Sequence, residues 1–465
     1  MKLFSAPTVS SSHRSSETIM INGVPDFRQQ SEKQSDALTH QINSLREYQE
    51  EWAQVPVRKR ILFLKRLRKL LLFNIADLTS RIKDQSAFDI VTAELLPLLS
   101  ATRFLERASS RLLRDKALSV VNRPLWLWGV KTTVTRKPLG VVLILAPGNY
   151  PLMLAGIQTL QALVAGNTVA LKPAPGRTAV LTHFASLLAQ SGLPDGTLQI
   201  LPEDAGPEAC RADVDLIVLT GSANTGRQVA LAAADNLTPT IMELSGADPV
   251  YVLPSGSLSL VTRALHFGLS LKQGATCIAP RRVFVEKTRR DALEARLISL
   301  LKKAPLRDQT APNPALDALL SRVIAAGGKA ILIGGATVFV LDAKHTDLVD
   351  IDLFAPWLAL ISVTDMDQAL ALERQAKHAL GASIFGNEDE ATALARHLPA
   401  GTITINDLIV PSADPRLAFG GAKSSGYGVT RGREGLLAMT RPASIAIRRR
   451  GALHLIERVR RWHSR

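Results

Sequence analysis

Hydrophobic residues are spaced differently in successive parts of the chain, and the spacing predicts the kind of element in each part. Between residues 35 and 115, leucine and isoleucine recur every three or four positions among basic residues, which indicates several packed helices. From residue 140 to 242, short apolar runs alternate with helix-like stretches. We expect strands over residues 140–145, 168–171, 198–201, 216–219 and 240–242, and helices over residues 152–164, 178–190 and 226–234. Such alternation is typical of a parallel sheet covered by helices on both faces.

A second alternating unit begins after Ser245. It predicts helices over residues 258–271 and 289–303, a Pro-rich break over 304–314, and strands over 282–285, 331–333, 338–341 and 358–363. The chain is therefore expected to be an α/β protein with two parallel-sheet units. Ligands of such sheets bind outside the carboxyl ends of the strands, so the loops 146–150, 172–177 and 220–225 are the first places to look for a site.

Two further segments depart from this alternation. Residues 1–30 are rich in serine and threonine without a sustained period, which predicts a mobile tail. Residues 126–136 are β-branched and aromatic, which predicts a strand or a hairpin.

The composition is that of an ordinary globular protein. Of 465 residues, 46% are hydrophobic and 21% are charged, which excludes a disordered or collagen-like chain. The two cysteines, Cys210 and Cys277, can form one bridge at most, which excludes a disulfide scaffold. No apolar run reaches the roughly 18 residues that span a bilayer, and the first residues lack the apolar core of a signal peptide. A cytoplasmic protein is expected.

Positive charge is the unusual property of the chain. The net charge is +15, and it is concentrated over residues 55–73 and over residues 448–465, which hold seven arginines and one glutamate. On a helix, the apolar residues of the second segment share one face, and these are Ala452, Leu455, Ile456, Val459 and Trp462. A basic amphipathic helix of this kind suits an anionic membrane surface, which would favour a long apolar substrate. A helix that packs its apolar stripe on the protein requires the same pattern, and both interpretations stay open. Nucleic acid is disfavoured because only one tryptophan interleaves the arginines.

Cys277 is a candidate nucleophile. It follows the small residues Gly274, Ala275 and Thr276, and two arginines come shortly after it. Positive charge lowers a thiol pKa and so activates the sulfur. A buried structural cysteine is the equally weighted alternative. Cys210 has no comparable surroundings and is expected to be structural.

Three other features carry chemistry at the ends of predicted strands. Glu243 is a candidate general base, although a solvated loop acid is the simpler explanation of one carboxylate. Asn149 can donate a hydrogen bond to an oxyanion, although Asn-Tyr-Pro is also ordinary turn chemistry. The glycines at 221 and 226 lie where a helix N-terminus could bind phosphate, but the GxGxxG fingerprint is absent.

Taken together and in order, these motifs resemble the aldehyde dehydrogenase superfamily. The resemblance covers about residues 35 to 440 and rests on seven segments: PGNYP, LKPAP, LTGSANTG, MELSGADP, GATCIAPRRVFV, DLFAPW and FGGAKSSGYG. It implies two Rossmann-like domains and an oligomerisation hairpin. The implied division is a cofactor-binding domain over 31–244 with the hairpin at 121–137, a catalytic domain over 245–420, a return segment over 421–447, and the basic amphipathic tail over 448–465.

The resemblance also implies an activity and a role for each site residue. The activity is oxidation of an aldehyde to a carboxylic acid with NAD or NADP, without a metal, in a homodimer or tetramer. Cys277 would attack the aldehyde to give a thiohemiacetal, Asn149 and the Cys277 N–H would hold the oxyanion, and Glu243 would activate water to hydrolyse the thioester. The cofactor would lie against Pro147, Lys172, Gly221, Ser222, Asp352 and Phe354.

Several residues depart from the family pattern. Gly148 stands where tryptophan is usual, which would loosen the wall beside Asn149. Pro175 replaces a ribose-binding glutamate, so NADP would be tolerated, with Arg177 nearby to meet its phosphate. Asp352 is one methylene shorter than the usual glutamate, and the stretch 335–352 is compressed. An acylating or reductive enzyme is one alternative. An inactive basic protein that binds membrane or nucleic acid is another.

Overall fold

The computed structural model describes residues 27–127, 129–307, 312–448 and 455–464. Its first unit is built on a sheet with strand order β17-β7-β6-β3-β4-β5, in which β17 alone is antiparallel to its neighbour among the described strands. The strands are β3 (Val141–Leu145), β4 (Thr168–Lys172), β5 (Leu198–Ile200), β6 (Leu216–Gly221), β7 (Thr240–Leu244) and β17 (Gly426–Tyr427). The predicted parallel sheet is therefore confirmed, and residues near 426 add a strand that the sequence did not indicate.

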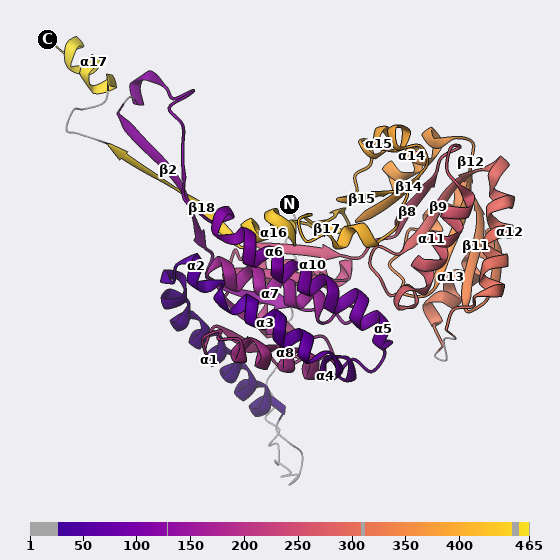
Figure 1. Cartoon of the computed structure of the whole chain (residues 1–465), viewed down its shortest axis with the longest axis horizontal. Coiled ribbons are helices and arrows are strands. Elements are labelled where there is room, and N and C mark those ends of the chain that lie inside the picture. The colour runs from indigo at the N-terminus through magenta and orange to yellow at the C-terminus, as the bar shows by residue number, and fades with distance from the viewer. Residues whose placement is uncertain (1–26, 128, 308–311, 449–454, 465) are drawn as a thin grey trace, which may run out of the picture.

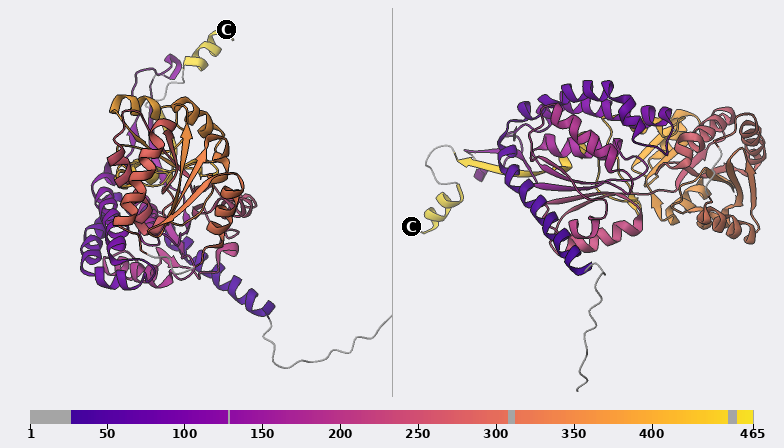
Figure 2. Two further views of the ribbon diagram at one scale, coloured as in Figure 1. Left: turned by 90° about the vertical axis from the view of Figure 1, so that its right-hand side faces the viewer. Right: turned by 90° about the horizontal axis from the view of Figure 1, so that it is seen from below.

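Helices cover both faces of this sheet (Figure 2, right). Strand β3 is buried throughout because alternate residues enter two different cores: Val142 and Ile144 on one face, Val141 and Leu143 on the other. The first core is closed by α2 (Val57–Arg60), α3 (Leu62–Phe73), α4 (Ile75–Ser80), α6 (Leu96–Leu112), α7 (Met153–Ala165), α8 (Thr178–Gln190) and α16 (Gly432–Ala438). The second is closed by α1 (Phe27–Gln54), α9 (Gly206–Ala209) and α10 (Ala223–Ala234).

The second unit is a sheet with order β10-β11-β12-β9-β8-β14-β15. Its strands are β8 (Asp248–Val252), β9 (Pro280–Glu286), β10 (Lys329–Ile333), β11 (Ala336–Asp342), β12 (Trp357–Val363), β14 (Gly381–Phe385) and β15 (Thr402–Ile405). Its helices are α11 (Leu258–Ser270), α12 (Lys287–Lys303), α13 (Pro314–Ala325), α14 (Met366–Gln375) and α15 (Glu388–Ala395). The unit lies beside the first, as the right half of Figure 1 shows.

A long arm projects from the first unit (Figure 1). It consists of β1 (Lys116–Ala117), β2 (Val130–Pro138) and β18 (Thr440–Arg448), and β2 pairs antiparallel with β18 along its whole length. The helix α17 (Leu455–His463) lies near its tip, against the short turn η2 (Leu125–Leu127). The strand predicted over 126–136 therefore begins later, at Val130. The apolar and aromatic composition of residues 126–136 could not distinguish the exposed turn η2 from the strand that follows it. The pairing of β2 with β18 determines where the strand begins.

Other expectations need correction as well. Residues 1–26 of the predicted tail lie outside the described residues, but Phe27 to Gln30 already belong to α1, because a polar segment of good helix formers needs no apolar period to be helical. The hairpin expected within 121–137 pairs instead with β1 before it and with β18, far away in sequence. Strands β8, β14 and β15 were not predicted, since periodicity alone cannot separate apolar runs of four or five residues from buried helix segments. Within the described residues, no helix is long and apolar enough to cross a membrane.

Candidate active site

A cavity of about 900 Å³ lies between the two units. It opens at the carboxyl ends of β3, β4, β6 and β7, where a parallel α/β sheet is expected to bind its ligand. The residues that the family resemblance assigns to catalysis and to the cofactor all line this cavity: Pro147, Asn149, Lys172, Gly221, Ser222, Glu243, Cys277, Asp352 and Phe354. The last three come from the second unit and its connections, so the cavity exists only when both units are folded.

Cys277 lies in the turn between α11 and β9, next to a strained stretch of backbone. Lys272, Gln273 and Gly274 have φ angles of 46°, 54° and 73°. The first two are unusual for non-glycine residues, and at Gly274 a Cβ would lie 2.3 Å from the carbonyl oxygen of Ala355. Burial, helped by the nearby Glu243 carboxylate, raises the pKa of the Cys277 thiol to about 12. The sulfur is therefore a neutral thiol at rest, and its attack requires a base.

Asn149 follows β3 in the loop 146–152 and reaches across to the Cys277 turn. Its side-chain Nδ2 donates to the carbonyl oxygen of Ala275 at 3.1 Å, and its Oδ1 accepts from the backbone N–H of Tyr150 at 3.0 Å. The next residue strengthens the connection, because the hydroxyl of Tyr150 lies 2.9 Å from that of Thr276. The amide is thus held two residues from the nucleophile.

Glu243 is a buried carboxylate with an unsatisfied oxygen. Its Oε2 accepts from the Thr430 hydroxyl at 2.7 Å, whereas Oε1 has no hydrogen-bond partner and lies 3.7 Å from Nη2 of Arg431. Burial raises the pKa of Glu243, and the Arg431 charge opposes that rise. A carboxylate whose proton affinity is raised and whose oxygen is free to accept a proton has the properties of a general base.

Arg431 and Thr430 were missed by the sequence reasoning. Both lie in the return segment before α16, and Arg431 has a φ of 59° and rests over the ring of Phe419 at 3.9 Å. Their distance from Glu243 along the chain hides the contact. The antiparallel pairing of Gly426 with Glu243 brings them together, and no sequence motif announces that pairing.

The opposite end of the cavity suits a dinucleotide. A Cβ added at Gly221 would meet only the Leu219 side chain, at 3.4 Å, and one added at Gly206 only the Lys172 side chain, at 3.6 Å, so both glycine backbones border open space. The hydroxyl of Ser222 caps α10 by accepting from the backbone N–H of Thr225 at 3.2 Å, which directs the start of that helix at the cavity. A phosphate group fits these surroundings.

The family assignment follows from the match of almost the whole chain. Residues 25–445 match the model of the aldehyde dehydrogenase family. The chain belongs to that family. A 4,4'-diapolycopene aldehyde oxidase of a Methylomonas species is 30% identical over 84% of this chain and 78% of its own length. A 4,4'-diapolycopene-4,4'-dial dehydrogenase of Cytobacillus firmus is 31% identical, over 66% of this chain and 71% of its own. The crystal structure of a Mycobacterium tuberculosis aldehyde dehydrogenase with NAD+ has a TM-score of 0.82 at 23% identity and covers 88% of this chain and 90% of its own.

This aldehyde dehydrogenase oxidises an aldehyde to the carboxylic acid, and its cofactor is NAD or NADP. The predicted family, fold class and activity are confirmed. The relatives give no support to the acylating alternative or to an inactive binding protein.

One argument for NADP needs correction. The guanidinium of Arg177 is held by both oxygens of Asp84 and by the carbonyl oxygen of Gly148, and Arg177 is not among the residues that line the cavity. Arg211 lines the cavity instead, close to Lys172. Cys210 also lines it, and burial raises the pKa of its thiol to about 11.

Proposed function

We propose that the enzyme oxidises its aldehyde through a thioester on Cys277, with Asn149 as oxyanion donor and Glu243 as general base. The observation that carries this assignment is the arrangement of all three in one cavity, with the only hydrogen bond to the Glu243 side chain among the described residues coming from Thr430. Acyl chemistry through a thioester needs a soft nucleophile, an oxyanion donor and a separate base, and these residues supply them.

The first half of the reaction forms the thiohemiacetal. Glu243 takes the thiol proton, the Cys277 sulfur bonds to the carbonyl carbon, and the π electrons of the carbonyl move to its oxygen. That oxyanion accepts hydrogen bonds from Nδ2 of Asn149 and from the N–H of Cys277. In the resting enzyme, Nδ2 of Asn149 donates to the carbonyl oxygen of Ala275. When the oxyanion forms, the same N–H group donates to the oxyanion instead. When bound, NAD(P)+ accepts the hydride that the carbon loses, and a thioester remains on Cys277.

The second half releases the acid. Glu243, after losing its first proton to solvent, takes a proton from water, and the resulting oxygen attacks the thioester carbon. The carbon–sulfur bond breaks with its electron pair on sulfur, and the leaving thiolate takes the proton from Glu243, which restores the thiol and the carboxylate. Raised proton affinity suits Glu243 to both transfers.

The cofactor residues are assigned in the same way. Lys172, whose ammonium donates to the carbonyl oxygen of Glu203 at 2.8 Å, would bind the adenosine ribose. Gly221 and Ser222 would approach the pyrophosphate. The remaining contacts would come from Pro147, Asp352 and Phe354, which line the same cavity. The accompanying division into a cofactor domain over 31–244 and a catalytic domain over 245–420 agrees with the two sheets.

A long apolar aldehyde is the proposed substrate. Gly148 leaves the wall beside Asn149 open, because a Cβ there would meet only the Ala174 Cβ, at 3.7 Å. Two relatives are named for aldehydes of diapolycopene, a long hydrocarbon. The tail is proposed to lie at an anionic membrane that holds such a substrate. In α17, Val459 and Trp462 are 54% and 76% exposed, so the protein does not cover these apolar side chains. The arm would also join copies of the chain into an oligomer.

The roles are tested by labelling cysteine with a thiol reagent and by a substrate screen. Aldehyde and cofactor together should protect Cys277 from labelling, and the protection should be greater than with cofactor alone. NADH and NADPH production should be highest with long-chain aldehydes among short, aromatic and long ones. Failure to protect Cys277 would contradict the nucleophile assignment, and preference for short aldehydes would contradict the substrate.

The tail is tested by co-sedimentation with anionic liposomes. The full chain should pellet with them at low salt and less at high salt, whereas a chain ending at Ile447 should stay in solution. Trp462→Ala should weaken pelleting, and neutral liposomes are the control. Equal pelleting of the two chains would exclude a role for the tail.

A further inference from the structure

A buried ion pair lies beside the proposed site but takes no part in the chemistry described above. Nζ of Lys272 is 2.5 Å from Oε1 of Glu94, and the two side chains are 2% and 0% exposed. The two residues are far apart in sequence: Glu94 lies in the π-helical turn η1 (Ile90–Leu95), and Lys272 begins the strained turn that leads to Cys277. π-Helical turns are frequent at functional sites. The pair therefore joins the helical layer of the first unit to the loop of the nucleophile.

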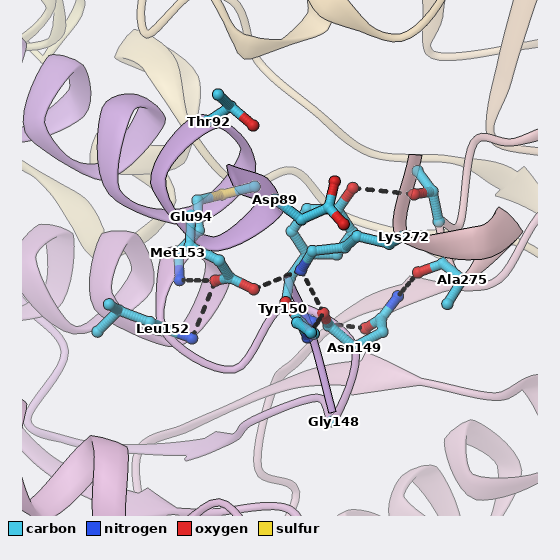
Figure 3. A network of polar contacts seen from close by, with 12 residues as sticks. Asp89, Thr92, Glu94, Gly148, Asn149, Tyr150, Leu152, Met153, Lys272 and Ala275 are labelled. Atoms are coloured by element: carbon cyan, nitrogen blue, oxygen red, sulfur yellow. Dashed lines mark hydrogen bonds and ion pairs between the residues drawn. The ribbon is translucent and has the colours of Figure 1, made fainter. Parts of the chain in front are cut away.

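Glu94 is satisfied on both oxygens. While Oε1 accepts from Lys272, Oε2 accepts from the backbone N–H groups of Leu152 and Met153, at 3.1 and 2.7 Å, where α7 begins. The carboxylate thus fixes the position of the lysine ammonium against a rigid, fully buried helix. Figure 3 shows these contacts meeting at the Glu94 carboxylate.

The Lys272 ammonium in turn holds the loop 146–152, which carries Asn149 and is called the oxyanion loop below. It donates to the main-chain carbonyl oxygen of Asn149 at 2.5 Å and lies 3.6 Å from the centre of the Tyr150 ring. Gln85 donates to the same Asn149 carbonyl at 3.0 Å. With the Asn149–Ala275 and Tyr150–Thr276 contacts, the oxyanion loop is tied to the Cys277 turn at both its backbone and its side chains.

We propose that Lys272, fixed by Glu94, is a positioning residue that sets the distance between the Asn149 amide and Cys277. The inference rests on the proposed roles of those two residues. The Asn149 amide must leave Ala275 and meet an oxyanion at Cys277, so its backbone has to be held while its side chain moves. The hydrogen bond from the Lys272 ammonium to the Asn149 carbonyl oxygen holds the backbone in place. It leaves the Asn149 side-chain amide free to move. Lys272 itself touches neither substrate nor cofactor.

The test replaces the pair by neutral residues of similar size. In Lys272→Met with Glu94→Gln, no charge is left buried, and the introduced amide oxygen can still accept from the start of α7. Hydride transfer is followed as NAD(P)H formation in a single turnover, with enzyme in excess over aldehyde. We expect its rate to fall about 10- to 100-fold, as displacements of about 1 Å do, while the Kd of the cofactor changes less than about threefold.

The matched control is Arg68→Met with Glu106→Gln. That pair joins α3 to α6 in the same helical layer at 2.7 Å but contacts neither Asn149 nor Lys272. It should leave the single-turnover rate unchanged. A second readout is non-additivity. In an Asn149→Ala background, the neutral pair should have little further effect on the rate if Lys272 acts through Asn149.

The results distinguish positioning from stability alone. A folded neutral pair with the wild-type single-turnover rate, or one whose rate loss is undiminished in the Asn149→Ala background, would overturn the proposal. If the Met–Gln pair does not fold, Lys272→Gln with Glu94→Gln replaces it, and failure of both to fold would show a purely structural role. Absence of aldehyde-dependent turnover in the wild type, or its persistence in Cys277→Ala, would instead overturn the proposed roles of the site residues.

Discussion

Two buried carboxylates, Glu243 in the lining of the cavity and Glu94 outside it, differ in how completely they are paired. Glu94 has its cation at 2.5 Å and two backbone donors on its other oxygen. Glu243 has its cation, Arg431, at 3.7 Å, and one oxygen without a hydrogen bond. Burial raises the pKa of both groups, and a nearby cation opposes the rise in each.

The comparison indicates which acid reacts and which one holds. A carboxylate that accepts hydrogen bonds on both oxygens loses part of that pairing when it takes a proton, so it is better suited to position its neighbours than to act as a base. Burial of a carboxylate with an unpaired oxygen costs free energy. Such a carboxylate is therefore expected mainly where function requires a proton acceptor. The more complete pairing of Glu94 and the incomplete pairing of Glu243 support the proposed roles, a positioning role for Glu94 and a general-base role for Glu243.

The largest expected effect concerns Cys277, the proposed nucleophile. Cys277→Ala should abolish aldehyde oxidation while cofactor binding, measured by fluorescence titration, stays nearly intact, because no thioester can form. Cys210→Ala is the control and should retain activity. Substantial turnover by Cys277→Ala would contradict the assignment of Cys277 as the nucleophile.

Glu243→Gln tests the reactive acid directly. Loss of a general base should lower the steady-state rate by about 10²- to 10⁴-fold. If deacylation suffers more than hydride transfer, a pre-steady-state burst of reduced cofactor should appear or grow in stopped-flow absorbance. Disappearance of the burst together with the steady-state rate would show that the loss of Glu243 slows formation of the thioester at least as much as its hydrolysis.

Replacement of each of the two acids should also affect the stability of the protein differently. Glu94→Gln leaves the Lys272 charge buried without its counterion and should lower the free energy of unfolding by about 3–5 kcal/mol. Glu243→Gln removes an incompletely paired buried charge and should leave stability at neutral pH unchanged or higher. Urea unfolding of the two variants measures both. Equal destabilisation would show that the two pairs serve the same purpose.

Arg431→Met should move the pH profile in a defined direction. Because the Arg431 charge lowers the pKa of Glu243, its loss should raise that pKa and shift the acidic limb of kcat to higher pH by about one unit or more. Activity on that limb would then fall at any fixed pH. Arg431→Lys keeps the charge and should shift the limb less. An unmoved limb would mean that another group titrates.

The smallest effect is expected from a change that contacts neither acid. Pro175 lines the cavity near Lys172, where a carboxylate would repel a 2'-phosphate. Pro175→Glu should shift preference towards NAD about tenfold, which corresponds to roughly 1–2 kcal/mol of repulsion. The ratio of kcat/KM for NAD and NADP measures it, with Pro175→Gln as the uncharged control. An unchanged ratio would assign the choice to other residues, such as Arg211.

Much of the fold and of the site could be predicted from local sequence. Continuous apolar runs located β3, β4 and β6, because strands buried on both faces must be apolar throughout. Motifs at the ends of those strands led to Asn149 and Lys172 for the same reason, since the topology of a parallel sheet brings its carboxyl ends to one edge. The arm was placed less well. Its exposed strands carry no burial pattern, and β18 alone fixes where β2 begins.

The sequence by itself therefore determined the parallel sheets and the family, and it gave the candidates for the reactive residues, because these depend on residue types and on short spacings. Only the tertiary structure decided which hydrogen-bond and ion-pair partners surround those residues, and so how their pKa values are shifted and their positions fixed. Arg431 meets Glu243 through one antiparallel pairing, and Lys272 meets Glu94 across 178 positions of chain. Arg177, expected at the cofactor, is bound by Asp84 instead. Hydrogen bonds and ion pairs form between groups that folding brings within about 3 Å, and no periodicity along the chain encodes that proximity.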